Sequence, residues 1–181
     1  MSGPSVDRSR SRAPGRRIYV SVIGASRCGP ELAAKAEELG RLLARRDCIV
    51  VCGGRSGVME AVARGAAAEG GVSIGVLPEA DRSNAAPDLT FSIPTGIGWA
   101  RNLAVVASGD VVIALGGAWG TLSEIALARN FGRTVVLLDS WTLTAPDRPG
   151  ESELDGVQRA SSPAEAVDLA LAALTPSLPD L

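Results

Sequence analysis

The segment at residues 114–129, ALGGAWGTLSEIALAR, places the carboxylate of Glu124 shortly after three glycines that follow an apolar run. The backbone N–H groups of such a turn, together with the N-terminus of a following helix, form a binding site for phosphate. The chain contains no histidine, which excludes Ser-His-Asp and Cys-His nucleophilic sites and imidazole metal ligands. Chemistry in this protein must therefore use carboxylates, arginines, hydroxyls or the backbone.

Glu124 has two interpretations, and the spacing leaves both open. Thr121 and Glu124 have the spacing of a capping box, in which the glutamate only accepts a hydrogen bond from the Thr121 backbone. Alternatively, Glu124 faces a ligand bound at the glycine-rich turn. In a helix over residues 121–129, we expect Glu124 to point away from the core, opposite an apolar stripe. That stripe comprises Leu122, Ile125, Ala126 and Arg129.

Arg101 lies in TGIGWARN, residues 95–102, at the start of a short helix expected over residues 98–107. An arginine there either faces the same ligand or is solvated. Two of the three tryptophans, Trp99 and Trp119, also lie in the glycine-rich segments. Their rings either cover a flat ring of a ligand or pack in the core or against another subunit.

Apolar runs rich in β-branched residues alternate with helical patterns along the chain. The runs predict strands over residues 18–23, 48–52, 72–77, 111–115 and 134–138, with a short extra strand over 89–94. Helices are expected over residues 31–46, 58–69, 98–107 and 121–129. A last helix opens with Ser162, Pro163 and Glu165, which have the spacing of a capping box. This order predicts an α/β fold with a parallel sheet.

Two strand-to-helix turns share the form G-G-x-x-G. The first contains Gly53, Gly54 and Gly57, and the second contains Gly116, Gly117 and Gly120. A third strand ends in IGASRCGPE, residues 23–31. In an open parallel sheet, such turns meet at the carboxyl ends of the strands, where ligands bind near the topological switch point. We therefore expect the three turns to form one crevice.

Two common glycine-rich nucleotide motifs do not match. Gly24 and Gly29 have the Walker A spacing, but Pro30 and Glu31 stand where Lys and Ser/Thr are required. The dinucleotide fingerprint does not follow the first strand, and the second strand ends in residues 52–54, CGG, in place of an acidic residue that binds a ribose. We therefore expect neither a Walker A site nor bound NAD or FAD.

Length and composition predict a single domain over residues 18–181, with 46% hydrophobic residues in a chain of 181. Residues 1–17 contain five arginines and one acidic residue, and we expect them to form a disordered basic tail. The net charge of the tail is +4 and that of the whole chain is −2, so the rest of the chain carries −6. Because the domain itself is acidic, we expect no nucleic-acid partner. The three cysteines lack the spacing of a disulfide framework, which fits a reducing compartment. No apolar run is long enough for a membrane span, so we expect a cytoplasmic protein.

Three motifs, in this order and spacing, resemble those of the Lonely-guy (LOG) proteins, once mislabelled lysine decarboxylases. They are GGRSGVMEAVARGA (53–66), PTGIGWARN (94–102) and LGGAWGTLSE (115–124). The resemblance covers residues 18–138 and is closer to the branch of molybdenum cofactor carrier proteins and relatives of the DNA-processing protein DprA. It implies a Rossmann-like, doubly wound, mostly parallel sheet flanked by helices, in a homodimer or tetramer.

LOG enzymes hydrolyse nucleoside 5′-monophosphates to free base and ribose 5-phosphate, using an arginine and the glutamate of P-G-G-x-G-T-x-x-E. Arg101 and Glu124 match those catalytic positions. The resemblance implies that Arg101 holds the phosphoribosyl group and that Glu124 stabilises positive charge or orients water, with no metal and no cofactor required. The turns and the motifs together predict further phosphate- or nucleotide-binding residues: Gly24, Ala25, Ser26, Gly53, Gly54, Gly57, Thr95, Gly96, Asn102, Gly116, Gly117, Trp119, Gly120 and Thr121.

Four positions depart from the LOG motifs and follow the carrier branch. Leu115 replaces a proline, Asn102 replaces a lysine, and Cys52 and Glu60 replace glycines. We favour the hypothesis of a nucleoside 5′-monophosphate phosphoribohydrolase. The alternative is a non-catalytic carrier that binds molybdenum cofactor.

Overall fold

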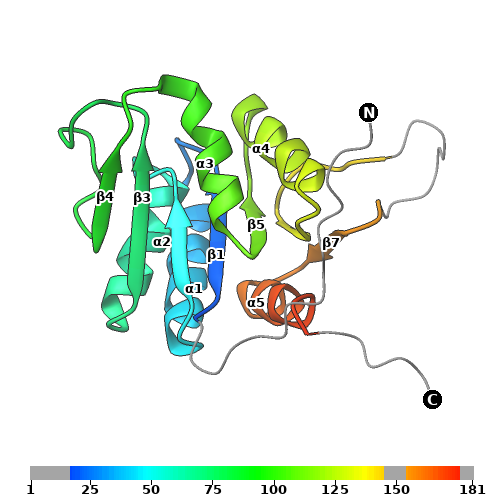
Figure 1. Ribbon diagram of the computed structural model, residues 1–181. Coiled ribbons are helices and arrows are strands. Elements are labelled where there is room, and N and C mark those ends of the chain that lie inside the picture. The colour runs from blue at the N-terminus through cyan, green and yellow to red at the C-terminus, as the bar shows by residue number, and fades with distance from the viewer. Residues whose placement is uncertain (1–16, 145–153, 176–181) are drawn as a thin grey trace, which may run out of the picture.

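A computed structural model describes residues 17–144 and 154–175 (Figure 1). Of the predicted basic tail, only Arg17 lies within these ranges, and its guanidinium forms an ion pair with Asp47 at 3.2 Å. The remainder of that prediction lies outside the described residues.

The described residues form seven strands, five α-helices and one 3₁₀ turn. The strands are β1 (Tyr19–Gly24), β2 (Ile49–Cys52), β3 (Val72–Leu77), β4 (Phe91–Pro94), β5 (Val111–Leu115), β6 (Val135–Leu138) and β7 (Val157–Ala160). The helices are α1 (Pro30–Arg45), α2 (Val58–Ala68), α3 (Arg101–Ser108), α4 (Trp119–Asn130) and α5 (Pro163–Ala172), and the 3₁₀ turn is η1 (Gly98–Ala100).

All seven strands pair in parallel in one sheet, in the order β4-β3-β2-β1-β5-β6-β7. Helices α1, α2 and α5 pack on one face of the sheet, and α3 and α4 pack on the other. Because both faces are covered, every residue of β2, β5 and β6 is buried, as expected for parallel strands with continuous apolar sequences. The predicted Rossmann-like, doubly wound α/β fold is confirmed.

The chain changes direction across the sheet at β1. It runs outward from β1 through β2 and β3 to β4, and then returns through α3 to place β5 on the other side of β1 (Figure 1). In the β1–β5 register, Gly24 is opposite Leu115, so the loops that follow both strands begin at the same level. This is the topological switch point, where open α/β sheets bind ligands.

The structure differs from the sequence prediction mainly at the ends of elements. Strand β7 was not expected, because its sequence VQRA contains two exposed polar residues in place of an apolar run. Helix α4 begins at Trp119, two residues earlier than expected. At the start of α5, Ser162 accepts a hydrogen bond from the Glu165 backbone as predicted, but the Glu165 carboxylate accepts from Ser161. Within the described ranges, no helix has the length and apolar character that crossing a membrane requires.

Candidate functional site

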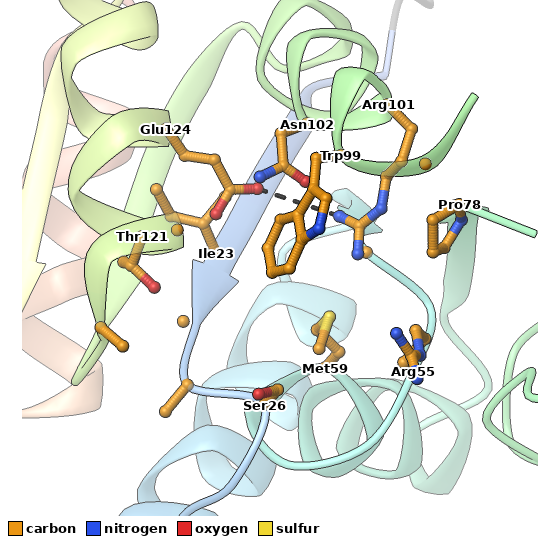
Figure 2. A pocket seen from close by; sticks show the side chains of 16 residues that line it. Ile23, Ser26, Arg55, Met59, Pro78, Trp99, Arg101, Asn102, Thr121 and Glu124 are labelled. Atoms are coloured by element: carbon orange, nitrogen blue, oxygen red, sulfur yellow. Dashed lines mark ion pairs between the residues drawn. The ribbon is translucent and has the colours of Figure 1, made fainter.

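A cleft of about 240 Å³ opens at the switch point, between the loops that follow β1 and β5 (Figure 2). Segments from β2, the β3–β4 connection, η1, α3 and the first turns of α4 complete its walls. The cleft brings together nine of the residues that the sequence predicted for the site: Gly24, Ala25, Ser26, Gly53, Arg101, Asn102, Gly120, Thr121 and Glu124. The expected crevice at the carboxyl ends of the strands is therefore present.

Arg101 and Glu124 face each other inside this cleft. Nη1 of Arg101, the first residue of α3, lies 3.9 Å from Oε1 of Glu124 on α4 (Figure 2). The side chains are only 10% and 8% exposed. The separation permits an ion pair but exceeds hydrogen-bond distance. In addition, Nε of Arg101 is buried without a hydrogen-bond partner among the described residues, and an unpaired buried donor is costly unless a ligand supplies the acceptor.

Glu124 points into the cleft from the buried face of α4, which corrects the expected orientation of this helix. The buried residues of α4 are Thr121, Glu124, Ile125 and Ala128, whereas Ala126 is exposed. Ile125 and Ala128 pack against the sheet, and the preceding turn carries Glu124 to the sheet's carboxyl edge. The orientation expected from the apolar stripe is wrong because a buried carboxylate interrupts the apolar pattern of this helix.

The capping-box interpretation of Glu124 is also wrong. The N-cap of α4 is Ala118, so Thr121 is already the third residue of the helix. No side chain caps this N-terminus. The carboxylate of Glu124 therefore remains available for a role in the cleft.

Burial controls the protonation of the pair. Removal from water raises the pKa of Glu124 to about 7, and the attraction of Arg101 opposes part of that rise. Burial also lowers the pKa of Arg101, while Glu124 acts in the opposite direction. A carboxyl group whose pKa lies near neutrality can both hold and release a proton at physiological pH, as a general acid or base must.

Gly53, directly after β2, makes room for the guanidinium. A Cβ atom on Gly53 would lie 2.7 Å from Nη2 of Arg101 and 2.6 Å from the sulfur of Met59. Neither distance is compatible with van der Waals contact, so a side chain at residue 53 would displace one of these groups. The absence of a side chain at Gly53 therefore allows the Arg101 guanidinium to occupy this position.

The N-terminus of α4 provides the candidate phosphate site. Ala118, Gly120 and Thr121 line the cleft at the uncapped start of the helix, where backbone N–H groups lack partners within the helix and the helix dipole favours an anion. Gly116 and Gly117 have φ angles of 56° and 124°, which glycine adopts readily. These two glycines therefore turn the chain from β5 into α4.

Seven predicted binding residues lie outside the lining of the cleft. They are Gly54, Gly57, Thr95, Gly96, Gly116, Gly117 and Trp119. Several of them shape the surrounding loops instead. Thr95, for example, donates a hydrogen bond from its hydroxyl to the Leu77 carbonyl at 2.7 Å. The ring of Trp119 lies 5.4 Å from that of Trp141, measured between centroids.

The structure adds lining residues that the site prediction did not include, among them Arg55, Met59 and Pro78. Trp99, for which the sequence left a ligand contact open, lines the cleft as well. Arg55 stands inside the first G-G-x-x-G turn, and a cation within a phosphate-binding turn was a usable signal. The Nε atom of Arg55 lies 3.5 Å from Oε1 of Glu79, and the Arg55 side chain is 47% exposed. Met59 and Pro78 carried no signal, because an apolar residue at a cleft looks like a core residue in sequence.

Neither a reactive thiol nor a metal cluster is found at the site within the described residues. Burial raises the pKa of the Cys52 thiol, next to Gly53, to about 11, so the thiol is neutral at physiological pH and a poor nucleophile. Residues 17–144 and 154–175 contain no cluster of three or more His, Cys, Asp or Glu side chains that could hold a metal ion.

The parallel sheet, the helix N-terminus at its switch point and the buried arginine–glutamate pair together define a LOG-like protein. More particularly, the chain belongs to the SLOG cluster4 family, whose model matches residues 17–167.

The proteins similar to this chain include an enzyme and proteins that bind molybdenum cofactor. A cytokinin riboside 5′-monophosphate phosphoribohydrolase of Mycobacterium marinum is 30% identical over 142 residues, which cover 74% of this chain and 76% of the relative. The molybdenum cofactor binding protein of Rippkaea orientalis is 36% identical with a TM-score of 0.80, over 89% of this chain and 99% of that one. The molybdenum cofactor carrier protein of Chlamydomonas reinhardtii is 31% identical with a TM-score of 0.74, over 88% and 99%.

Proposed function

We propose that this protein binds a nucleoside 5′-monophosphate in the cleft and hydrolyses the N-glycosidic bond, giving free base and ribose 5-phosphate. The observation that carries the proposal is the buried pair of Arg101 and Glu124, 3.9 Å apart, with the pKa of Glu124 at about 7. The similarity to the Mycobacterium marinum phosphoribohydrolase supports it.

The phosphate end of the ligand fits the anion-binding features of the cleft. The uncapped N-terminus of α4 supplies backbone N–H donors. Arg55 supplies a positive charge at the mouth, and its side chain is partly exposed. To contact a phosphate it would exchange its ion pair with Glu79 for one with the ligand. Arg101 has an unused donor, Nε. We assign the phosphate to the α4 N-terminus and Arg55, and the ribose to the space beside Arg101 and Glu124.

In the proposed reaction, the bond between ribose C1′ and the base nitrogen breaks, and its electron pair leaves with the base. Positive charge then develops on the ribose, as in glycoside hydrolysis. Ionised Glu124 stabilises this charge and accepts a proton from the attacking water, whose oxygen becomes the new hydroxyl on C1′. That proton passes to the departing base nitrogen, which completes the products. Arg101 holds the phosphoribosyl group and the Glu124 carboxylate in register.

The test is release of free base from a panel of nucleoside monophosphates, measured by chromatography. The wild-type protein should turn over at least one member of the panel. Glu124→Gln, which keeps the shape of the side chain but cannot accept a proton, should abolish turnover while retaining nucleotide binding. Absence of base release from every member would refute the proposal.

A second candidate function is carriage of molybdenum cofactor. The similarity to the Rippkaea orientalis protein over 99% of that chain favours it. So does Asn102, which lines the cleft where LOG enzymes have a lysine. For this function we expect saturable binding of the cofactor and slower oxidation of its pterin in the presence of the protein. A protein that neither binds the cofactor nor slows its oxidation would rule this function out.

A further inference from the structure

Trp99 occupies an unusual position for a tryptophan. It lines the cleft, yet 83% of its surface is exposed, the largest value among the exposed large hydrophobic residues that the structure describes. It lies in η1, two residues before Arg101. An indole normally buries a large apolar area, so this exposed ring is a surface that a ligand could cover.

The indole reaches across the mouth of the cleft. Its Cζ3 atom lies 3.4 Å from the position that a Cβ on Gly120 would occupy, so the ring edge stands over the first turn of α4. In Figure 2 the ring lies in front of the Arg101–Glu124 pair. Trp99 therefore connects the α3 side of the cleft to the α4 side.

An apolar wall faces this ring. The side chain of Met59 rises from α2 into the cleft, on the side opposite Trp99 (Figure 2), and is 6% exposed. Ile23 and Pro78 also line the cleft. A thioether packs favourably against aromatic rings. A flat ring bound against Trp99 would thus lie in a cleft with further apolar groups, Met59 among them.

The polar groups of the cleft favour a ligand that also carries a negative charge. Nε of Arg101 is buried and lacks a partner within the described part of the chain, and the α4 N-terminus has no side-chain cap. A purely apolar ligand would satisfy neither. A ligand with a planar ring at one end and a phosphate at the other would satisfy both.

We infer that Trp99 is the residue that recognises the ring of the ligand, by stacking on a planar bicyclic heteroaromatic group such as a purine or a pterin. This inference rests on the proposed function, to which it adds the determinant of ring specificity. Arg101 and Glu124 act on the sugar phosphate, whereas Trp99 selects what is attached to it. Ribose 5-phosphate, which has no ring system of this kind, should not depend on Trp99.

The experiment is calorimetric titration in the Glu124→Gln background, which prevents turnover. The probes are AMP, neopterin monophosphate and ribose 5-phosphate. Trp99→Ala should weaken the ring-bearing probes by about 5- to 100-fold, the range for loss of one base–aromatic stack. Trp99→Phe, which retains an aromatic face, should restore most of that affinity, and ribose 5-phosphate should bind equally well to all variants. Phe91→Ala is the matched control, since Phe91 is 59% exposed on β4 and does not line the cleft.

Three results would overturn the inference. The first is an equal loss of affinity for ribose 5-phosphate, and the second is no loss for either ring-bearing probe, including the case in which neither binds the parent protein. The third is a fall in oligomeric mass shared by Trp99→Ala and Leu103→Ala, because Leu103 is exposed on α3 and a shared effect would assign Trp99 to a contact between copies. If base release is absent but ring binding still requires Trp99, the proposed hydrolysis fails and the inference stands.

Discussion

The guanidinium of Arg101 rests against the backbone of Gly53, closer than any side chain at residue 53 would permit. Arg101 begins α3 on one face of the sheet, and Gly53 directly follows β2 at the sheet's carboxyl edge. The lack of a Cβ at this position leaves room for the guanidinium on its way to Glu124. Several expected effects of substitution and pH follow from this geometry.

Gly53→Ala should impair activity more than stability. The added methyl group displaces the Arg101 guanidinium or the Met59 thioether. Since both groups are the ends of flexible side chains, the cost in stability should lie at the low end of the range of about 1 to 3 kcal/mol for overpacking. We expect kcat/KM to fall by at least about tenfold, because a misplacement of about 1 Å at a catalytic group has effects of this size or larger. Steady-state kinetics and urea unfolding measure the two effects. The control is Gly29→Ala, where a methyl group meets no atom within 4 Å; an equal loss of activity in both variants would contradict the assignment.

The pH dependence of hydrolysis should follow the ionisation of Glu124. Since the ionised carboxylate is the active form and its pKa is about 7, kcat/KM should rise with pH through about 7 and level off above it. Initial rates between pH 5 and 9 at low substrate concentration test this. A rate that is independent of pH between 5.5 and 8 would show that Glu124 does not act as the base.

The ionisation of Glu124 should also make protein stability depend on pH, and stability should fall as pH rises, whereas activity rises. The folded-state pKa of about 7 lies above the ordinary glutamate value of 4.5, so the folded state binds this proton more tightly. The Glu124 contribution to the free energy of unfolding is fully present below pH 4.5 and is lost as pH rises through 7, by on the order of 3 kcal/mol in total.

Glu124→Gln lacks this titration, so it should gain stability relative to wild type as pH rises from 5 to 8. Arg101 stays protonated over that range. The loss of its ion pair with residue 124 therefore changes the free energy of unfolding of the variant by an amount that does not depend on pH. Urea unfolding at several pH values measures the difference, with the exposed Glu38→Gln as control. Parallel stability curves for wild type and Glu124→Gln would argue against a raised pKa.

Arg55→Ala should weaken binding of the phosphate group. Loss of one charge-assisted contact should raise the KM for AMP about tenfold and reduce the salt dependence of binding. Adenosine, which lacks the phosphate, should bind equally well to both proteins. A matching loss for adenosine would show that Arg55 acts on the loop and not on the ligand.

The sequence predicted the strands well because a parallel sheet covered on both faces requires continuous apolar runs. The resemblance to LOG proteins implied that Arg101 and Glu124 share one site, since both match catalytic positions of that family, whereas the residues alone left both roles open. The orientation of Glu124 could not be predicted from the apolar pattern, which does not distinguish a side chain facing solvent from one facing a cleft. Strand β7 was missed because it lies at the edge of the sheet and carries polar residues.

The two halves of the cleft come from separate stretches of chain. Arg101 and Glu124 belong to one continuous α3–β5–α4 unit, whereas Gly53 and Arg55 come from the β2–α2 connection and Met59 from the first turn of α2. Apart from Gly53, which contacts Arg101, substitutions in this second stretch can reshape the space for a ligand without moving the reactive pair. Descendants of such a protein can therefore change ligands while inheriting the same reactive centre, and a single scaffold can serve both hydrolysis and carriage.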